Sequence, residues 1–262
     1  MDNRGKRFKG LIDLKVLSVK HWTEKTFSFV VERPTGFRFR SGEFAMIGLE
    51  DGASPLLRAY SIASPNWADD LEFYSIKVQD GPLTSRLQNL KVGDYILLRP
   101  KPVGTLVLDA LLTGKRLILL STGTGIAPFA SVIRDPETYE KFEEVVLTHT
   151  CRELLELDYG KSLAKNMLAD PLLSEIIGSK FSLISTTTRE NSEFTGRMTN
   201  WLLDSRFKNF TGESLNVEND RVMICGSMDM LKSHKGICEN IDMIEGSNSD
   251  PGHFVIEKAF TD

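Results

Sequence analysis

The rhythm of apolar residues changes near Thr113-Gly114-Lys115, and this change constrains the fold more than any other feature of the sequence. Before it, short segments alternate apolar and polar residues between turn residues, which is typical of half-buried strands. After it, continuous apolar runs alternate with helical patterns, which is typical of parallel strands buried on both faces. At 262 residues the chain has about twice the usual length of one domain. We therefore expect two domains, 1–114 and 115–262.

The first domain is expected to be an antiparallel β-barrel. Its strands are predicted at 11–19, 26–31, 44–49, 71–78 and 95–98, with a further strand that starts at Arg58. A helix at 83–90 interrupts them, and Pro82 stands near its start. About six short strands at this spacing favour a barrel.

The second domain is expected to be a doubly wound α/β fold with a parallel sheet. Its strands are predicted at 116–120, 144–149, 181–185 and 221–225. Helices are predicted between them at 126–134, 154–168, 197–203 and 227–240, and residues 208–220 are predicted to form a polar surface loop. Strands that alternate with helices in this way build parallel sheets.

Composition excludes several classes of protein. No apolar run approaches the ~18 residues that span a membrane, and the charged N-terminus lacks the apolar stretch of a signal peptide. The three cysteines, Cys151, Cys225 and Cys238, form no CxxC pair. They support neither a disulfide framework nor a zinc site, so we expect no bound metal. We expect a monomer in the reducing cytoplasm.

The net charge of −4 is unevenly distributed. Residues 1–114 hold 16 Lys and Arg against 13 Asp and Glu, a net charge of +3, and residues 115–262 carry −7. This modest basic excess does not suit nucleic acid. It is either a solvated face or an electrostatic footprint for an acidic partner protein, and the sequence leaves both open.

A glycine-rich segment follows the first buried strand of the second domain. Ser121-Thr122-Gly123-Thr124-Gly125-Ile126-Ala127-Pro128 leads from that strand into a helix. Backbone N–H groups at a helix start bind anions, and glycines let a pyrophosphate approach closely. Pro128 replaces the third glycine of the dinucleotide-binding pattern, so a tight turn without ligand is the alternative.

The next strands end in arginines. Arg152 follows the second predicted strand, where an NAD site usually presents an acidic residue, and Thr188-Arg189 and Arg197 follow the third. Guanidinium groups match phosphate oxygens. Each arginine alone is more commonly a surface residue, but together they favour the 2′-phosphate of NADP.

Two motifs in the first domain also suit a nucleotide cofactor. Arg58-Ala59-Tyr60-Ser61 offers a charge for a diphosphate, a flat ring and a hydroxyl. Gly81-Pro82-Leu83-Thr84-Ser85 leads into a helix with two hydroxyls in its first turn, which suits an anion or, alternatively, helix capping.

These motifs, together with Cys225-Gly226-Ser227, have the order and spacing of the ferredoxin–NADP reductase family. The chain resembles the bacterial subclass, whose members end in Ala-Phe and a few residues, as in Ala259-Phe260-Thr261-Asp262. The resemblance implies an FAD-binding barrel, an NADP-binding α/β domain, and electron transfer between NADPH and ferredoxin or flavodoxin. The same fold also occurs in flavin or quinone reductases and in electron-transfer subunits of larger complexes.

The resemblance also implies roles for single residues. Arg58 would bind the FAD pyrophosphate, Tyr60 would flank the isoalloxazine, and Ser61 would lie near its N5 atom. The remaining FAD-side residues would be Ala59, Tyr74, Lys77, Val78, Leu83, Thr84 and Ser85. The NADP-side residues would be Gly123, Thr124, Gly125, Arg152, Thr188, Arg189, Arg197, Gly226 and Ser227. The residues at the site of hydride transfer would be Ser61, Cys225, Ala259 and Phe260.

Two expectations follow, one for the C-terminus and one for the basic N-terminal segment. Deletion of residues 259–262 should change NADP(H) affinity or the rate of hydride transfer, because Ala259 and Phe260 would cover the flavin. Charge reversal at Lys6, Lys9 or Arg40 should weaken reduction of an acidic ferredoxin more at low salt than at high salt.

Overall fold

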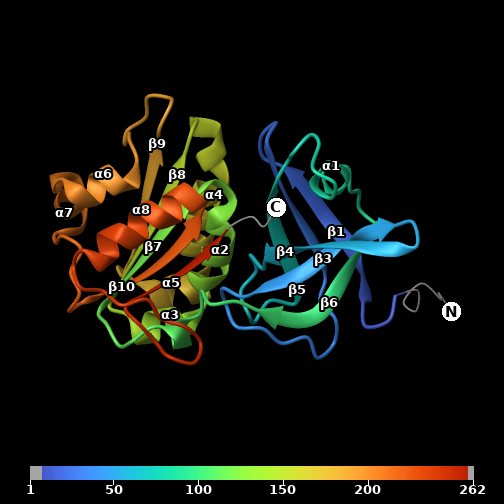
Figure 1. The fold of residues 1–262 in the computed structure, drawn as a ribbon, viewed down its shortest axis with the longest axis horizontal. Helices are drawn as coiled ribbons and strands as arrows, with labels where there is room; N and C mark the ends of the chain where they lie inside the picture. The colour runs from blue at the N-terminus through green and yellow to red at the C-terminus, as the bar shows by residue number, and fades with distance from the viewer. Residues whose placement is uncertain (1–7, 259–262) are drawn as a thin grey trace.

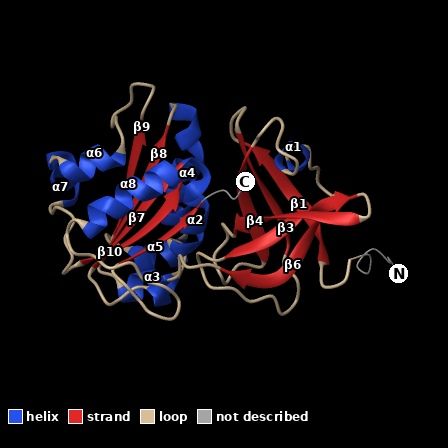
Figure 2. Cartoon of the chain, in the orientation of Figure 1, coloured by secondary structure: helices blue, strands red, loops and turns tan. Residues whose placement is uncertain are grey.

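The computed structural model describes residues 8–258 and contains two sheets that lie side by side (Figure 1). The N-terminal sheet is almost free of helices, whereas helices cover both faces of the C-terminal sheet (Figure 2). The expected order, an antiparallel barrel followed by a parallel α/β domain, is confirmed.

Six antiparallel strands form the barrel, in the order β4-β3-β6-β1-β2-β5. The strands are β1 (Ile12–His21), β2 (Thr26–Glu32), β3 (Phe44–Asp51), β4 (Ser54–Ser61), β5 (Asp70–Ile76) and β6 (Tyr95–Val103). A bridge between Ile62 and Phe73 joins the two ends of this order and closes the sheet. Fully buried phenylalanines fill the interior, among them Phe27, Phe29 and Phe73.

The barrel corrects two predictions about where elements begin. Arg58 does not start a strand: β4 already begins at Ser54, so the motif that starts at Arg58 ends the strand. Pro55 is the reason for the wrong prediction, because proline usually breaks a strand; β4 lies at one end of the strand order, where a proline is tolerated. The expected helix at 83–90 is only the single turn α1 (Thr84–Leu87).

Five parallel strands form the second sheet, in the order β11-β10-β7-β8-β9. The strands are β7 (Arg116–Thr122), β8 (Glu144–Cys151), β9 (Phe181–Thr187), β10 (Asp220–Gly226) and β11 (Phe254–Lys258). The order runs one way from β7 to β9 and the other way from β7 to β11. The connections therefore reverse direction between β7 and β10, which is where doubly wound sheets bind ligands.

Helices cover both faces of this sheet. They are α2 (Ala127–Val132), α3 (Pro136–Lys141), α4 (Asp158–Ala169), α5 (Pro171–Ile177), α6 (Met198–Leu203), α7 (Ser205–Thr211) and α8 (Met228–Glu239). The alternation of β7 divides the core: Leu117 and Leu119 pack with α2 to α5, and Ile118 and Leu120 pack with α6 to α8. Every helix within residues 8–258 is too short or too polar to cross a membrane.

Three short helices were not predicted: α3, α5 and α7. Of these, α7 shows that part of the predicted loop at 208–220 is helical. Asp204 accepts a hydrogen bond from the Arg206 N–H and caps the start of α7, and Gly212 ends it with a φ of 85°. Phe207 anchors the helix in the core. Such capping residues indicate a helix even where the surrounding segment is polar.

The predicted boundary between residues 114 and 115 falls in the connection between Val103, which ends β6, and Arg116, which begins β7. This connection packs against the second sheet. Leu106, Val107 and Leu111 belong to the core that covers β7. The same core also includes Ala63 and Tyr74 of the barrel, so the exact position of the domain boundary stays a prediction.

Candidate functional site

The two loops at the carboxyl ends of β7 and β10 lie against each other. A Cβ atom on Gly125 would lie 2.4 Å from the Cys225 carbonyl oxygen. One on Gly226 would lie 2.3 Å from Thr122 Oγ1. Both glycines are therefore required by the close approach of the loops, and the pair of loops forms the edge of the site.

Thr124 carries the feature of this edge that best fits a bound cofactor. Its side chain is 8% exposed, and its Oγ1 has no hydrogen-bond partner within residues 8–258. Buried hydroxyls are normally hydrogen-bonded, so an unpartnered one in a glycine-rich loop suits an atom supplied by a ligand. Gly123 beside it has a φ of 53°, which glycine adopts without strain.

His149 on β8 supports this loop from below, and the sequence did not single it out. Its Nε2 lies 3.0 Å from the Gly123 carbonyl oxygen and 3.2 Å from the Cys151 sulfur. Burial lowers the pKa of His149 to about 4, although the bond to Gly123 raises it. The neutral imidazole thus donates from Nε2 to the loop. Burial also raises the pKa of Cys151 to about 12, so its thiol stays protonated.

Backbone hydrogen bonds join the segments that carry the three predicted phosphate-binding arginines. The Arg189 N–H donates to the Arg152 carbonyl over 3.0 Å, which joins the segments that follow β8 and β9. The Gly196 N–H donates to the Thr187 carbonyl over 2.8 Å, which brings Arg197 to the same edge. All three side chains are exposed. Their guanidinium groups form no hydrogen bond or ion pair within the described part of the chain.

Thr188 and Ser227 have structural contacts of their own at this edge. The Thr188 hydroxyl donates to the Cys151 carbonyl over 3.3 Å. The Ser227 hydroxyl accepts from the Met230 N–H and caps α8. The first bond fixes the segment after β9, which carries Arg189, and the second fixes the start of α8 beside Gly226.

The barrel motif at Arg58 divides between the two faces of β4. Arg58 and Tyr60 share one face and Ala59 and Ser61 the other, because side chains alternate along a strand. The Tyr60 hydroxyl accepts a hydrogen bond from Ser75 Oγ over 3.3 Å. Burial raises the pKa of Tyr60, which keeps the ring neutral.

The segment that follows β5 continues the barrel side of the site. Lys77 Nζ donates to the Thr23 carbonyl over 2.8 Å, and Val78 is exposed. The Thr84 hydroxyl donates back to the Val78 carbonyl, and Ser85 is half-buried. The alternative that the two hydroxyls cap α1 is wrong, because the capping position is Leu83 and no side chain caps it.

Two predicted FAD-side residues are buried by packing contacts within the protein. The Leu83 side chain is 2% exposed in the barrel core, so only its backbone is available to a ligand. The Tyr74 ring stacks on Tyr159 of the other domain, with centroids 3.9 Å apart and planes 5° apart. The sequence missed both placements because they depend on packing within the barrel and between the domains.

Cys225 and Glu257 are paired neighbours on β10 and β11. Burial raises the pKa of the Cys225 thiol well above its usual value. Burial also raises the pKa of Glu257 to about 7; the hydrogen bond from the Thr105 N–H lowers it and the charge of Glu43 raises it. Ala259 and Phe260, which follow β11, lie outside the described residues.

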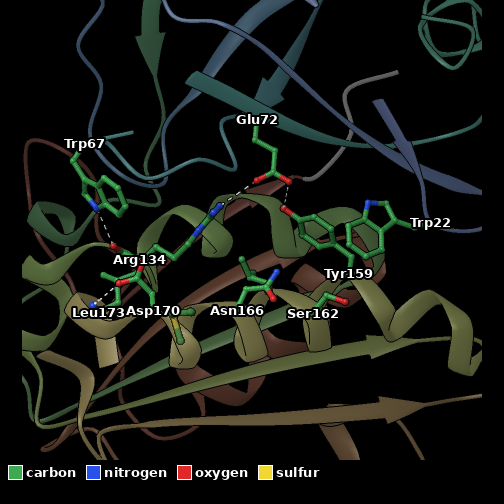
Figure 3. A pocket seen from close by; sticks show the side chains of 11 residues that line it. Trp22, Trp67, Glu72, Arg134, Tyr159, Ser162, Asn166, Asp170 and Leu173 are labelled. Carbon is green, nitrogen blue, oxygen red and sulfur yellow. Dashed lines mark hydrogen bonds and ion pairs between the residues drawn. The ribbon is translucent and has the colours of Figure 1, made fainter. Parts of the chain in front are cut away.

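A separate pocket of about 250 Å³ lies between the domains (Figure 3). Glu72 of the barrel binds Arg134 and Tyr159 of the second domain across it, each at 3.3 Å. The Trp67 indole N–H donates to the Arg134 carbonyl over 3.0 Å. None of the predicted cofactor-binding residues lines this pocket. Because residues of both domains line it, the pocket is part of the domain interface.

Comparison with known proteins gives one consistent picture. The family of oxidoreductase NAD-binding domains matches residues 119–235. The flavodoxin/ferredoxin–NADP reductase of Rhodobacter capsulatus is 55% identical over 94% of this chain and 92% of its own length. The ferredoxin–NADP reductase of Pseudomonas aeruginosa is 46% identical over 95% of this chain and 97% of its own length.

Similarity to a solved structure extends over both domains. The ferredoxin NADP⁺ reductase of Neisseria gonorrhoeae, solved with bound FAD and NADP, superimposes with a TM-score of 0.87 at 30% identity. The match covers 97% of this chain and all of that one. The barrel, the crossover between β7 and β10 and the identity over nearly the whole length lead to one conclusion: this chain belongs to the ferredoxin/flavodoxin–NADP reductase family.

Proposed function

We propose that this chain is an FAD-dependent oxidoreductase that transfers electrons between NADPH and ferredoxin or flavodoxin. The observation that carries the proposal is the 55% identity to the Rhodobacter capsulatus reductase, because it spans both domains. Bound FAD supplies the conversion between a two-electron hydride and single electrons. The chain supplies binding, orientation and electrostatics.

The barrel residues hold the FAD in this proposal. Arg58 binds its pyrophosphate, Tyr60 flanks its ring system, and Ser61 lies beside the ring. Lys77, Val78, Thr84 and Ser85 hold the rest of the cofactor. The half-buried faces of β4 and the exposed segment after β5 support this assignment.

The second domain holds the NADP(H). The glycine-rich loop and Gly226 accommodate the dinucleotide at the crossover, and the hydroxyl of Thr124 supplies a hydrogen bond there. Arg152, Arg189 and Arg197 bind the 2′-phosphate, with Thr188 between them. The exposed, unpaired guanidinium groups support this role, since a phosphate needs no existing ion pair to break.

Cys225 shapes the nicotinamide side of the site without acting as a nucleophile. Its thiol is 1% exposed, and its raised pKa keeps it protonated. A protonated, buried thiol behaves as a small apolar group. Its proposed role is therefore steric.

A spectroscopic titration tests the function. The purified holoprotein should show a flavin absorption spectrum that bleaches on anaerobic addition of NADPH and much less with NADH. Bleached protein should then reduce ferredoxin or flavodoxin faster than free FMN or a quinone. A chain without flavin, or one that NADPH fails to bleach, would contradict the proposal. A preference for free FMN would favour a flavin reductase instead.

The C-terminal residues supply a second test. Ala259 and Phe260 cover the flavin in this proposal and must move for hydride transfer. Deletion of residues 259–262 should change the affinity for NADP(H) or the hydride-transfer rate. Steady-state kinetics identical to those of the full chain would contradict this role.

Action as a monomer in the cytoplasm also stays a prediction. The three free, buried cysteines agree with a reducing compartment.

A further inference from the structure

The turn at residues 23–26, between β1 and β2, contacts both sides of the proposed site. Toward the FAD side, the Lys77 N–H donates to the Lys25 carbonyl over 2.7 Å. Toward the NADP side, Lys25 Nζ lies 3.0 Å from Glu153 Oε1 and 3.7 Å from Glu156 Oε1. Lys25 is thus a barrel cation that reaches into the other domain.

Glu153 and Glu156 belong to the loop that carries Arg152. Glu156 Oε2 accepts hydrogen bonds from the N–H groups of Arg152, at 2.9 Å, and Glu153, at 3.0 Å. Glu153 and Glu156 also form a capping box at the start of the short helix 154–157. The Glu156 carboxylate, which fixes the backbone of Arg152, and the carboxylate of the adjacent Glu153 therefore place negative charge beside Arg152.

That negative charge opposes the binding of a phosphate. Like charges near a surface repel over several ångströms, within a screening length of about 8 Å at physiological salt. An ammonium group that contacts both carboxylates offsets their charge. The hydrogen bond to Glu153 raises the pKa of Lys25, so the ammonium stays charged.

We propose that Lys25 of the FAD domain is a specificity-determining residue for the coenzyme. By neutralising Glu153 and Glu156, it makes the surroundings of Arg152 favourable for the 2′-phosphate of NADPH, which NADH lacks. This inference rests on the proposed binding of the 2′-phosphate at Arg152. It implies that coenzyme preference depends on both domains.

The test compares kcat/KM for NADPH and NADH in the holoenzyme, with ferricyanide as electron acceptor. Lys25→Met should lower the ratio of NADPH to NADH efficiency about two- to fivefold at low salt, as expected for a partly exposed ion pair. The loss should appear in the KM for NADPH and shrink at high salt. Lys25→Arg, which keeps the charge, should retain the ratio.

Lys20→Met is the matched control. It removes the same charge from the adjacent strand β1, where Lys20 Nζ lies 3.4 Å from the centre of the Trp22 ring and forms no carboxylate contact in the described chain. Its ratio should equal that of the unchanged enzyme. A Lys25→Met ratio equal to that of the unchanged enzyme, or an equal fall in Lys20→Met, would overturn the inference.

Arg152→Gln separates failure of the inference from failure of the proposed site. If Arg152→Gln lowers the coenzyme ratio and Lys25→Met does not, the inference about Lys25 is wrong and the proposed phosphate site stands. If Arg152→Gln leaves the ratio unchanged, the 2′-phosphate does not bind at Arg152, and both proposals are overturned.

Discussion

At the scale of single residues, Glu257 gives the folding stability a predictable pH dependence. Its pKa is raised to about 7, chiefly by burial, from an ordinary value near 4.5. The carboxyl is neutral in both the folded and unfolded states at low pH, and it is ionised in both at high pH. Between these limits the unfolded chain releases the proton and the folded chain keeps it, which favours the unfolded state. The free energy of unfolding therefore falls as the pH rises from about 4.5 to 7.

Glu257→Gln should remove this dependence. Relative to the unchanged chain, the variant should gain on the order of 2 kcal/mol in free energy of unfolding between pH 5 and pH 8. Urea unfolding at several pH values measures it. Glu24→Gln, which changes an exposed carboxylate in the turn after β1, should show no such trend. Parallel pH curves for Glu257→Gln and the unchanged chain would contradict the assignment.

At the scale of elements, the packing of α4 on β8 holds the glycine-rich loop in place. A Cβ atom on Gly160 of α4 would lie 2.6 Å from His149 Nδ1 and 2.8 Å from Ile126 Cδ1. Gly160→Ala should therefore displace His149 and lower the free energy of unfolding by about 1–3 kcal/mol. Chemical denaturation measures this change.

Gly236 in α8 provides the matched control, because a Cβ atom there would meet nothing within 4 Å. Gly236→Ala should raise the free energy of unfolding by about 0.5–1 kcal/mol, since alanine is the better helix former. If both substitutions stabilised the protein, the close contact between Gly160 and His149 would not limit the packing of α4.

At the scale of the whole molecule, Glu72 links the two domains through Arg134 and Tyr159 (Figure 3). Glu72→Gln and Tyr159→Phe should each lower the free energy of unfolding by about 1 kcal/mol. The double variant should lose less than the sum, because Tyr159→Phe removes the hydroxyl that donates to Glu72, and Glu72→Gln weakens that same hydrogen bond by removing the charge of its acceptor. Tyr139→Phe, whose hydroxyl binds the Ile133 carbonyl within one domain, should be additive with Glu72→Gln. Additivity of Glu72→Gln with Tyr159→Phe would argue against the link.

The uneven charge of the molecule bears on partner binding at the same scale. Lys6 lies outside the described residues, and Arg40 is already paired with Glu43 and Asp109. Lys9 is exposed and remains the clearest candidate of the three. Lys9→Glu should lower kcat/KM for an acidic ferredoxin more at low than at high ionic strength.

Lys208→Glu is the control for this experiment. It makes the same charge change on α7, at the end of the molecule away from the barrel (Figure 1). Its effect on ferredoxin reduction should be small at every salt concentration. An equal effect of the two reversals would point to net charge instead of a docking face on the barrel.

Much of the architecture could be predicted from the sequence because its causes are local. The alternation of Leu14, Lys15 and Val16 in β1 and the continuous apolar runs of β7 and β10 reveal which faces are buried before any fold is known. Capping residues also mark helices locally, and α7 was missed although Asp204 and Gly212 delimit it. The glycines at 123 and 125 similarly indicate a loop that needs unusual backbone freedom.

The sequence by itself therefore determined the order of the two domains, the strand and helix periods, and the loop that follows β7. Only the tertiary structure decided that Leu83 is buried in the barrel core, that Tyr74 stacks on Tyr159, that His149 supports Gly123, and that Lys25 contacts Glu153. Lys25 and Glu153 are 128 positions apart. Such contacts depend on strand register and on the packing of one domain against the other, and no local pattern of residues encodes either.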